Sequence, residues 1–124
     1  MQRVVFVVDD NDINLSVAKE ALKEQYKVFT MPSAAKMFSF MEKMKPDMIL
    51  LDIEMPEMNG FEALTLLKNN SSYAGIPVIF LSGTDDASIR SRGLEQGVTD
   101  FILKPFSAEV LQESIKNHLV GSGQ

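Results

Sequence analysis

Met48-Ile49-Leu50-Leu51-Asp52 is an apolar run that ends in a carboxylate. Similar runs, rich in branched or aromatic residues, recur at 4–8, 26–30, 78–81 and 101–103. Short continuous runs of this kind are typical of strands that are buried on both faces of a sheet. The sequence therefore predicts five buried strands, of which 48–51 is the third.

Segments with a helical spacing of apolar residues follow these runs. Strands that alternate with helices form right-handed crossovers, which build a parallel sheet with helices on both faces. We therefore expect a single doubly wound α/β domain. The expected inner stripes of the five helices are Ile13, Val17 and Ala21; Met37, Met41 and Met44; Phe61, Leu64 and Leu67; Ile89, Gly93 and Leu94; and Val110, Leu111, Ser114, Ile115 and Leu119.

Small and polar residues mark the points where helices should begin. Ser33 after Pro32, Gly60, Asp86 and Ser107 stand at four of these points. Such residues favour caps and turns, so they agree with the predicted helix starts.

The composition limits the classes of protein to consider. With 124 residues and 45% hydrophobic content, the chain suits one core, so we place one domain at 1–120 and interpret 121–124 as a flexible tail or linker stub. The net charge of -5, with 12 scattered Lys and Arg, leaves no basic footprint for nucleic acid. The lack of cysteine excludes a disulfide framework and a thiolate metal site. The apolar runs are too short to span a bilayer, so we expect a cytoplasmic protein without membrane contact.

Two other features are interpreted as structural. The methionine-rich stretch from 31 to 44 is expected to pack in the core, where flexible thioether side chains fill gaps. His118 has no acidic, Cys or His neighbour at ligand spacing in the sequence. We therefore predict a solvent-facing side chain with no role in a site.

Polar residues end or follow four of the five runs: Asp9 and Asp10, Asp52, Ser82, and Lys104. In an open parallel sheet, ligands bind beyond the carboxyl ends of the strands. Three carboxylates at one edge repel each other and favour a hard cation such as Mg²⁺. A lysine and a hydroxyl nearby would contact the oxygens of a phosphoryl group on Asp52. Alone, each residue would be a cap, a turn residue or a surface group, and only their joint placement predicts a phosphoryl-transfer site.

These residues resemble the receiver domain of two-component response regulators, from Val4 to about Leu119. Asp52 and Ser82 are 30 positions apart, and Ser82 and Lys104 are 22 apart, so order and separation together are specific. The stretches that carry the resemblance are Val7-Val8-Asp9-Asp10-Asn11, Leu51-Asp52-Ile53-Glu54-Met55-Pro56 through Asn59-Gly60, Leu81-Ser82-Gly83, and Lys104-Pro105-Phe106.

The resemblance implies a flavodoxin-like sheet of order 2-1-3-4-5 and a signalling domain that is not an enzyme beyond its own phosphorylation and slow dephosphorylation. Asp52 would accept phosphate from a sensor histidine kinase or a histidine phosphotransfer protein. Mg²⁺, or Mn²⁺, would be held by Asp10, Asp52 and the backbone carbonyl of Glu54, and by Asp9 partly through water. Lys104 would contact a phosphoryl oxygen.

The resemblance also implies a switch. Ser82 would move to the phosphoryl group, and the ring of Phe101 would turn inward, although the family more often has threonine and tyrosine at these positions. Partners or an attached output domain would bind the surface from about 86 to 119, and the family allows a phosphorylation-dependent dimer. Glu54 and Thr84 would tune hydrolysis, and Pro105 would follow a cis peptide bond.

Other classes fit less well. A haloacid-dehalogenase-like phosphatase requires a second Asp where Glu54 stands, and a nucleotide or flavin binder requires a glycine-rich loop after the first strand. The remaining alternative is a receiver-like interaction module that is never phosphorylated. Retention of every expected pocket group argues against that alternative.

Overall fold

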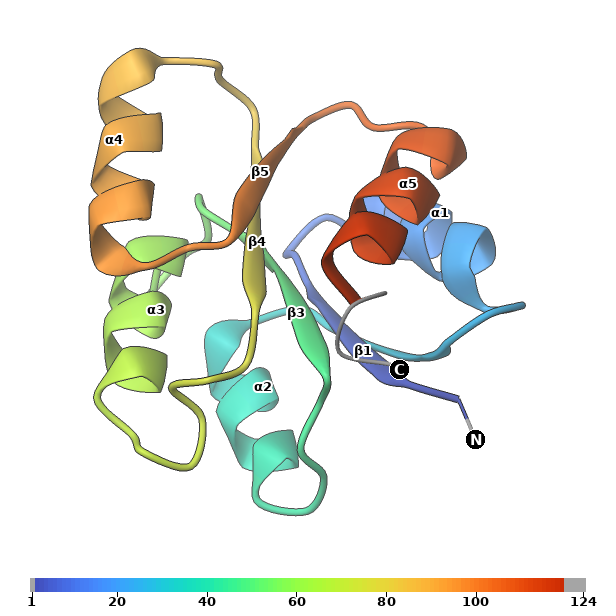
Figure 1. The fold of residues 1–124 in the computed structure, drawn as a ribbon, viewed down its shortest axis with the longest axis horizontal. Coiled ribbons are helices and arrows are strands. Elements are labelled where there is room, and N and C mark those ends of the chain that lie inside the picture. Colours follow the sequence, from blue (N-terminus) through green and yellow to red (C-terminus); the bar gives the residue numbers. More distant parts are fainter. Residues whose placement is uncertain (1, 120–124) are drawn as a thin grey trace.

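Strands and helices alternate along residues 2–119, the part of the chain that the computed structural model describes (Figure 1). The strands are β1 (Val4–Val8), β2 (Lys27–Met31), β3 (Met48–Asp52), β4 (Val78–Ser82) and β5 (Asp100–Leu103). The helices are α1 (Asp12–Leu22), α2 (Ala34–Met41), α3 (Gly60–Lys68), α4 (Ala87–Gln96) and α5 (Ala108–Leu119). The five predicted strands are present, and four of them differ by one residue at one or both ends.

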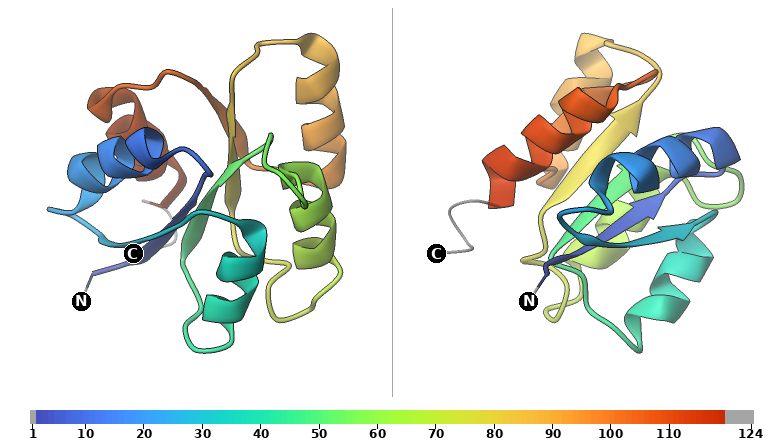
Figure 2. Two further views of the ribbon diagram at one scale, coloured as in Figure 1. Left: turned by 180° about the vertical axis from the view of Figure 1, so that it is seen from behind. Right: turned by 90° about the vertical axis from the view of Figure 1, so that its right-hand side faces the viewer.

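The strands form one parallel sheet of order β2-β1-β3-β4-β5. Helices α1 and α5 pack on one face, and α2, α3 and α4 lie on the other (Figure 2). Every residue of β3 and β4 is buried, which agrees with their continuous apolar runs. The predicted fold class and strand order are confirmed.

The core has two halves, one on each face of the sheet. The half under α2 and α3 contains Met37, Met41, Phe61, Leu64 and Leu67, so the stripes predicted for these helices and the core role of the methionines are confirmed. The half under α1 and α5 holds Leu111, Ile115 and Leu119.

Four predicted inner residues are wrong. In α1, Ile13 is 72% and Val17 is 37% exposed, and the buried stripe consists of Leu15, Ala18, Ala21 and Leu22. Leu94 in α4 and Val110 in α5 are also exposed. Neighbouring helix residues point about 100° apart. Because α4 buries Gly93, the next side chain, Leu94, points outward, and because α5 buries Leu111, the preceding side chain, Val110, points outward. Both stripes of α1 have helical spacing, and packing against α5 selects one.

The helices begin at or beside the small and polar residues that were predicted to mark their starts, with one difference in α3. Ser33 and Asp86 cap α2 and α4, as expected. Asn59, rather than Gly60, caps α3, and its side chain forms a capping box with Glu62. Asn11 caps α1 by accepting from the Asn14 N–H.

Two further expectations concern membrane-spanning helices and the end of the chain. Within residues 2–119, no helix is long and apolar enough to cross a membrane. The expected tail at 121–124 lies outside the described residues.

Candidate functional site

Three carboxylates meet at the carboxyl ends of the neighbouring strands β1 and β3. Asp9 and Asp10 follow β1, and Asp52 ends β3, which lies beside β1. Each of the three offers an oxygen, and these oxygens lie within 4.8 Å of one another. The structure therefore brings together the three acidic residues that the sequence singled out.

Asp9 is fully buried, and its carboxylate is held by the start of α1. Its Oδ1 accepts from the Asn11 N–H at 2.9 Å, and its Oδ2 accepts from the Asn14 side-chain amide at 3.1 Å. Asn14 is a site residue that sequence reasoning missed. Its position five residues after Asp9, on the first turn of α1, is the only sequence signal for it.

Asp52 is 1% exposed, and its two oxygens have different surroundings. Oδ1 accepts from the Lys104 ammonium at 2.8 Å and from the Glu54 N–H at 3.2 Å. Oδ2 is buried and has no hydrogen-bond partner among the described residues. A buried carboxylate oxygen without a partner carries a desolvation cost, and such atoms call for a ligand or a functional reason.

Lys104 reaches the carboxylates from the loop after β5. Its Nζ lies 2.8 Å from Asp52 Oδ1 and 3.5 Å from Asp9 Oδ2, and its side chain is 20% exposed. Burial lowers the pKa of Lys104, but the hydrogen bond and charge of Asp52, together with Asp9, outweigh burial and raise it. The ammonium therefore stays charged at neutral pH. The peptide bond between Lys104 and Pro105 is cis.

The electrostatics of the site disfavour the ionised form of Asp52. Burial is the largest effect, and the nearby Asp9 charge adds to it, so the pKa of Asp52 rises to about 6 despite Lys104 and the Glu54 N–H, which lower it. A second cation would favour the ionised form by offsetting the repulsion between the carboxylates.

A close backbone turn supports the end of β3. The Gly60 N–H donates to the Ile53 carbonyl at 2.7 Å. A Cβ at Gly60 would lie 2.7 Å from the Asp52 carbonyl oxygen and 2.8 Å from the Ile53 Cα. Glycine is therefore required here by the approach of α3 to the site strand.

Ser82 and Thr84 lie together at the end of β4. The Ser82 hydroxyl donates to the Thr84 carbonyl at 2.8 Å and accepts from the Thr84 N–H at 3.1 Å. Ser82 is buried, whereas the Thr84 and Glu54 side chains are exposed. The Ser82 proton is thus committed to its own loop in this structure.

The ring of Phe101 is half-buried between the sheet and α4. Its centroid lies 5.9 Å from that of Phe80, and the Arg90 guanidinium carbon is 4.9 Å from it. A Cβ on Gly93 would come within 2.7 Å of Phe101 Cζ. The ring therefore rests directly on the backbone of α4, where Gly93 makes room for it.

His118 does not simply face solvent, so the prediction for it is corrected. Its Nε2 lies 2.9 Å from Asp100 Oδ2, and its side chain is 28% exposed. The sequence did not indicate this partner, because Asp100 lies 18 positions before His118, at the start of β5. The packing of α5 on the sheet brings the two side chains together.

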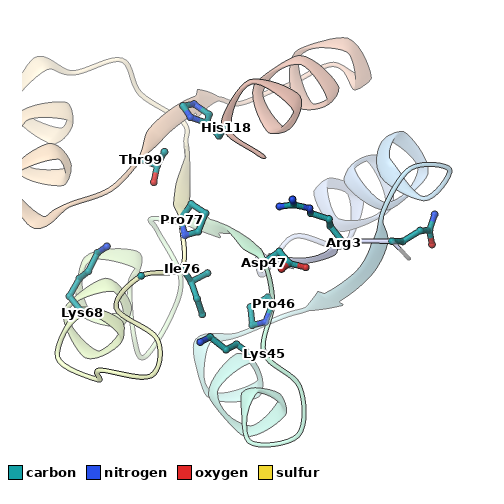
Figure 3. Close-up of a pocket in the computed structure, with 11 residues that line it drawn as sticks. Arg3, Lys45, Pro46, Asp47, Lys68, Ile76, Pro77, Thr99 and His118 are labelled. Carbon is teal, nitrogen blue, oxygen red and sulfur yellow. The ribbon is translucent and has the colours of Figure 1, made fainter. Parts of the chain in front are cut away.

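A hollow of about 880 Å³ lies at the opposite, amino end of the sheet (Figure 3). Two of its charged side chains are engaged in structural contacts. Asp47 accepts from the Val4 N–H at 2.7 Å, and Lys68 donates to the Ala74 carbonyl at 3.1 Å. Among the described residues that line this hollow, none has a buried side-chain atom without a partner like Oδ2 of Asp52.

The family of the chain is shown by comparison with known proteins. The model of the response regulator receiver domain matches residues 5–116. A probable cyclic di-GMP phosphodiesterase of Vibrio cholerae is 32% identical over 95% of this chain, and the match covers 27% of that relative. The chain spans less than half of the length of several curated relatives that it matches, among them a sensor histidine kinase of Ectopseudomonas mendocina, of which it covers 12%.

Solved structures agree with this family. The receiver domain of a signal transduction histidine kinase from Syntrophus aciditrophicus is 32% identical, with a TM-score of 0.86 over 96% of this chain and 91% of that one. The BeF3-activated receiver domain of DrrB, a Thermotoga maritima protein, is 26% identical, with a TM-score of 0.87 over 96% of this chain and 98% of that one. With its matched sequence, its sheet order and its acidic cluster, this chain belongs to the response regulator receiver domains of two-component systems.

Proposed function

We propose that the chain is a phosphorylation-controlled switch in which Asp52 accepts a phosphoryl group from a phosphohistidine. The donor would be a sensor histidine kinase or a histidine phosphotransfer protein. The observation that carries this proposal is Asp52 Oδ2, which is buried and has no partner within residues 2–119, while Oδ1 is held by Lys104 and the Glu54 N–H. One oxygen is thus positioned and the other is left for bond formation.

The reaction follows from this asymmetry. The Oδ2 lone pair forms the new bond to phosphorus as the bond from phosphorus to the histidine nitrogen breaks. The leaving imidazole keeps the electron pair of that bond and then takes a proton. Lys104 stays within reach of the phosphoryl oxygens and offsets their charge, since its Nζ already lies 2.8 Å from Asp52.

Mg²⁺, or Mn²⁺, fits the donor set of this site. Asp9, Asp10 and Asp52 supply three carboxylates that converge within 4.8 Å, which suits a hard cation. We expect Asp10, Asp52, the Glu54 carbonyl and, partly through water, Asp9 to hold it. A bound cation would neutralise phosphoryl charge and the repulsion between carboxylates.

The switch would begin at Ser82. To donate to a phosphoryl group, its hydroxyl must leave the Thr84 carbonyl, to which it is bonded at 2.8 Å. That movement changes the loop before α4 and the space beside Phe101, which rests on Gly93 of that helix. Phosphorylation would thereby favour one of two arrangements of α4 and β5.

The surface formed by α4, β5 and α5 is the proposed readout. Leu94, Leu103 and Val110, one from each element, are 59%, 51% and 49% exposed. Exposed apolar side chains of this kind favour protein partners, which here would be a separate protein, an attached output domain or a second phosphorylated copy. The Glu54 and Thr84 side chains, which are exposed, would tune hydrolysis of the acyl phosphate.

The test uses beryllofluoride, which mimics the phosphoryl group. Amide NMR spectra are recorded with and without Mg²⁺ for the wild type, Asp52→Asn and the control Asp47→Asn at the other end of β3. We expect Mg²⁺-dependent shifts at Ser82, Phe101 and Lys104 in the wild type and in the control, and no response in Asp52→Asn.

A second measurement tests the covalent step. Phosphoramidate, which carries a phosphorus–nitrogen bond, should add one base-labile phosphoryl group to the wild type and none to Asp52→Asn, as measured by intact mass. A folded wild type that responds to neither reagent would refute the proposal and favour the unphosphorylated interaction module.

A further inference from the structure

The outer edge of β2 is open. This strand ends the sheet and pairs only with β1 among the described strands. Lys27 donates its N–H to Arg3, and Met31 accepts from Asp9, both on the β1 side. Because backbone groups alternate along a strand, the N–H and C=O of Val28 and Thr30 point away from β1, toward the free edge.

A groove follows this edge, and we call it the β2 groove. It has a volume of about 520 Å³ and lies between α1 and α2, which flank β2 on opposite faces of the sheet (Figure 2, right). Its floor is strand β2 with Pro32, and its walls are Lys19 from α1 and Lys36, Ser39, Phe40 and Lys43 from α2 and the turn that follows it.

The charge of the β2 groove is opposite to that of the protein. The chain has a net charge of -5, yet the groove contains three lysines and no carboxylate among its lining residues. None of the three ammonium groups forms an ion pair with a described residue. Lys27, at the start of β2, adds a fourth cation 5.8 Å from the Phe29 ring centroid.

The β2 groove also offers apolar contact. The half-buried rings of Phe29 and Phe40 line it, with centroids 5.0 Å apart. An added strand presents its side chains alternately to the two sides of a sheet. The side toward α2 carries the aromatic rings together with Lys36 and Lys43, so side chains of the added strand on that side would meet both the rings and these two lysines. Acidic side chains on the other side would reach Lys19 of α1.

We propose that the β2 groove binds an extended, acidic segment of a partner protein, which adds to the sheet as a further strand beside β2. Main-chain hydrogen bonds to Val28 and Thr30 would give affinity, and the lysines would select acidic segments. This inference does not rest on the phosphorylation of Asp52, which lies at the end of β3.

Lysines beside an edge strand also have a protective role. They prevent pairing with a second copy of the chain, and the like charges of two β2 grooves would oppose such a pair. Protection alone, however, does not require a hollow lined by aromatic rings. An acidic segment accounts for the charge, the hollow and the open backbone groups together.

The experiment uses a capped peptide of alternating glutamate and valine as the probe. Binding to the full chain is followed by amide NMR, and we expect the largest shifts and slowed hydrogen exchange at Val28 and Thr30. N-methylation of the peptide amides that face β2 should abolish binding, since it removes the donors without changing charge. The matching peptide of glutamine and valine should bind about tenfold more weakly.

Variants identify the surface. Lys36→Glu and Lys43→Glu should each weaken peptide binding about fivefold, whereas Lys116→Glu on α5 should leave it unchanged. The Asp52→Asn variant should bind as well as the wild type, which separates this inference from the proposed function.

The proposal is overturned if the wild type does not bind the acidic peptide. It is also overturned if N-methylation has no effect, or if anionic vesicles or nucleic acid shift the same amides while the peptide does not. Self-association of Lys36→Glu, without peptide binding by the wild type, would show that the lysines only protect the edge.

Discussion

Strand β3 has an aspartate at each end, and the two carboxylates have different surroundings in the fold. Asp47, just before the strand, accepts from the Val4 N–H at 2.7 Å and so joins β3 to β1. Asp52, at the other end, has an oxygen without a partner in the described part of the chain and a pKa raised to about 6 by burial and by Asp9. One aspartate stabilises the fold, and the other is held in a state that costs stability. Such costs concentrate at functional sites.

The largest expected effect concerns the turn behind Asp52. Gly60→Ala should lower the free energy of unfolding by about 2 to 3 kcal/mol, because the new Cβ would overlap backbone atoms of Asp52 and Ile53. The control is Gly75→Ala at the amino end of the sheet, where a Cβ meets nothing within 4 Å. Urea denaturation measures both, and equal effects would contradict the close approach.

The second prediction compares the two aspartates directly. Without divalent cations at neutral pH, Asp52→Asn should raise the free energy of unfolding by about 1 to 2 kcal/mol. The substitution removes a charge that burial and Asp9 disfavour, and this gain is partly offset by loss of the ion pair with Lys104. Asp47→Asn should lower it by about 1 kcal/mol, because a weaker acceptor faces the Val4 N–H. Thermal and urea denaturation measure the difference, and a loss of stability in Asp52→Asn would refute the electrostatic account.

Magnesium should reverse the first of these changes. Added Mg²⁺ is expected to raise the melting temperature of the wild type and of Asp47→Asn, but not that of Asp52→Asn, since a ligand stabilises the state that binds it. A similar gain in all three proteins would place the cation elsewhere.

The fourth prediction concerns pH in the absence of metal. Because the folded-state pKa of Asp52 is raised to about 6, the folded state keeps a proton that the unfolded state has already lost. The contribution of Asp52 to stability is therefore fully present below about pH 4 and declines as the pH rises through about 6. The difference in unfolding free energy between Asp52→Asn and the wild type should grow over this interval. A difference that is constant with pH would show that the pKa is not raised.

The smallest effect is expected at Asn14. Asn14→Ala removes the amide that donates to Asp9 at 3.1 Å, which should cost about 0.5 to 1 kcal/mol in the wild type. In the Asp52→Asn background, where the repulsion between Asp9 and Asp52 is absent, the cost should be smaller. A double-mutant cycle measures this coupling, and strict additivity would show that Asn14 acts independently of the acidic site.

Much of the fold and of the acidic cluster followed from local patterns in the sequence. Five apolar runs predicted the strands, because a strand buried on both faces needs apolar side chains throughout. The residues after those runs were expected at one end of the sheet, because parallel strands all point the same way. Asp9, Asp10 and Asp52 do converge there.

Other features were beyond local patterns. The inward stripe of α1, the contact of Asn14 with Asp9 and the pair of His118 with Asp100 depend on how helices dock on the sheet. Helical spacing fits two stripes of α1 equally well, and only packing against α5 distinguishes them.

The sequence by itself determined the class of fold, the order of the strands through its resemblance to receiver domains, and the chemistry available at their ends. Only the tertiary structure decided that Lys104 binds one oxygen of Asp52 while the other has no partner among the residues described. It also decided that lysines from α1, from α2 and from the turn after α2 line one groove along the open edge of β2. The physical reason is that periodicity and residue type act over a few neighbouring residues. Desolvation, pairing of charges and the shape of a groove arise from residues that are distant in the chain and adjacent in space.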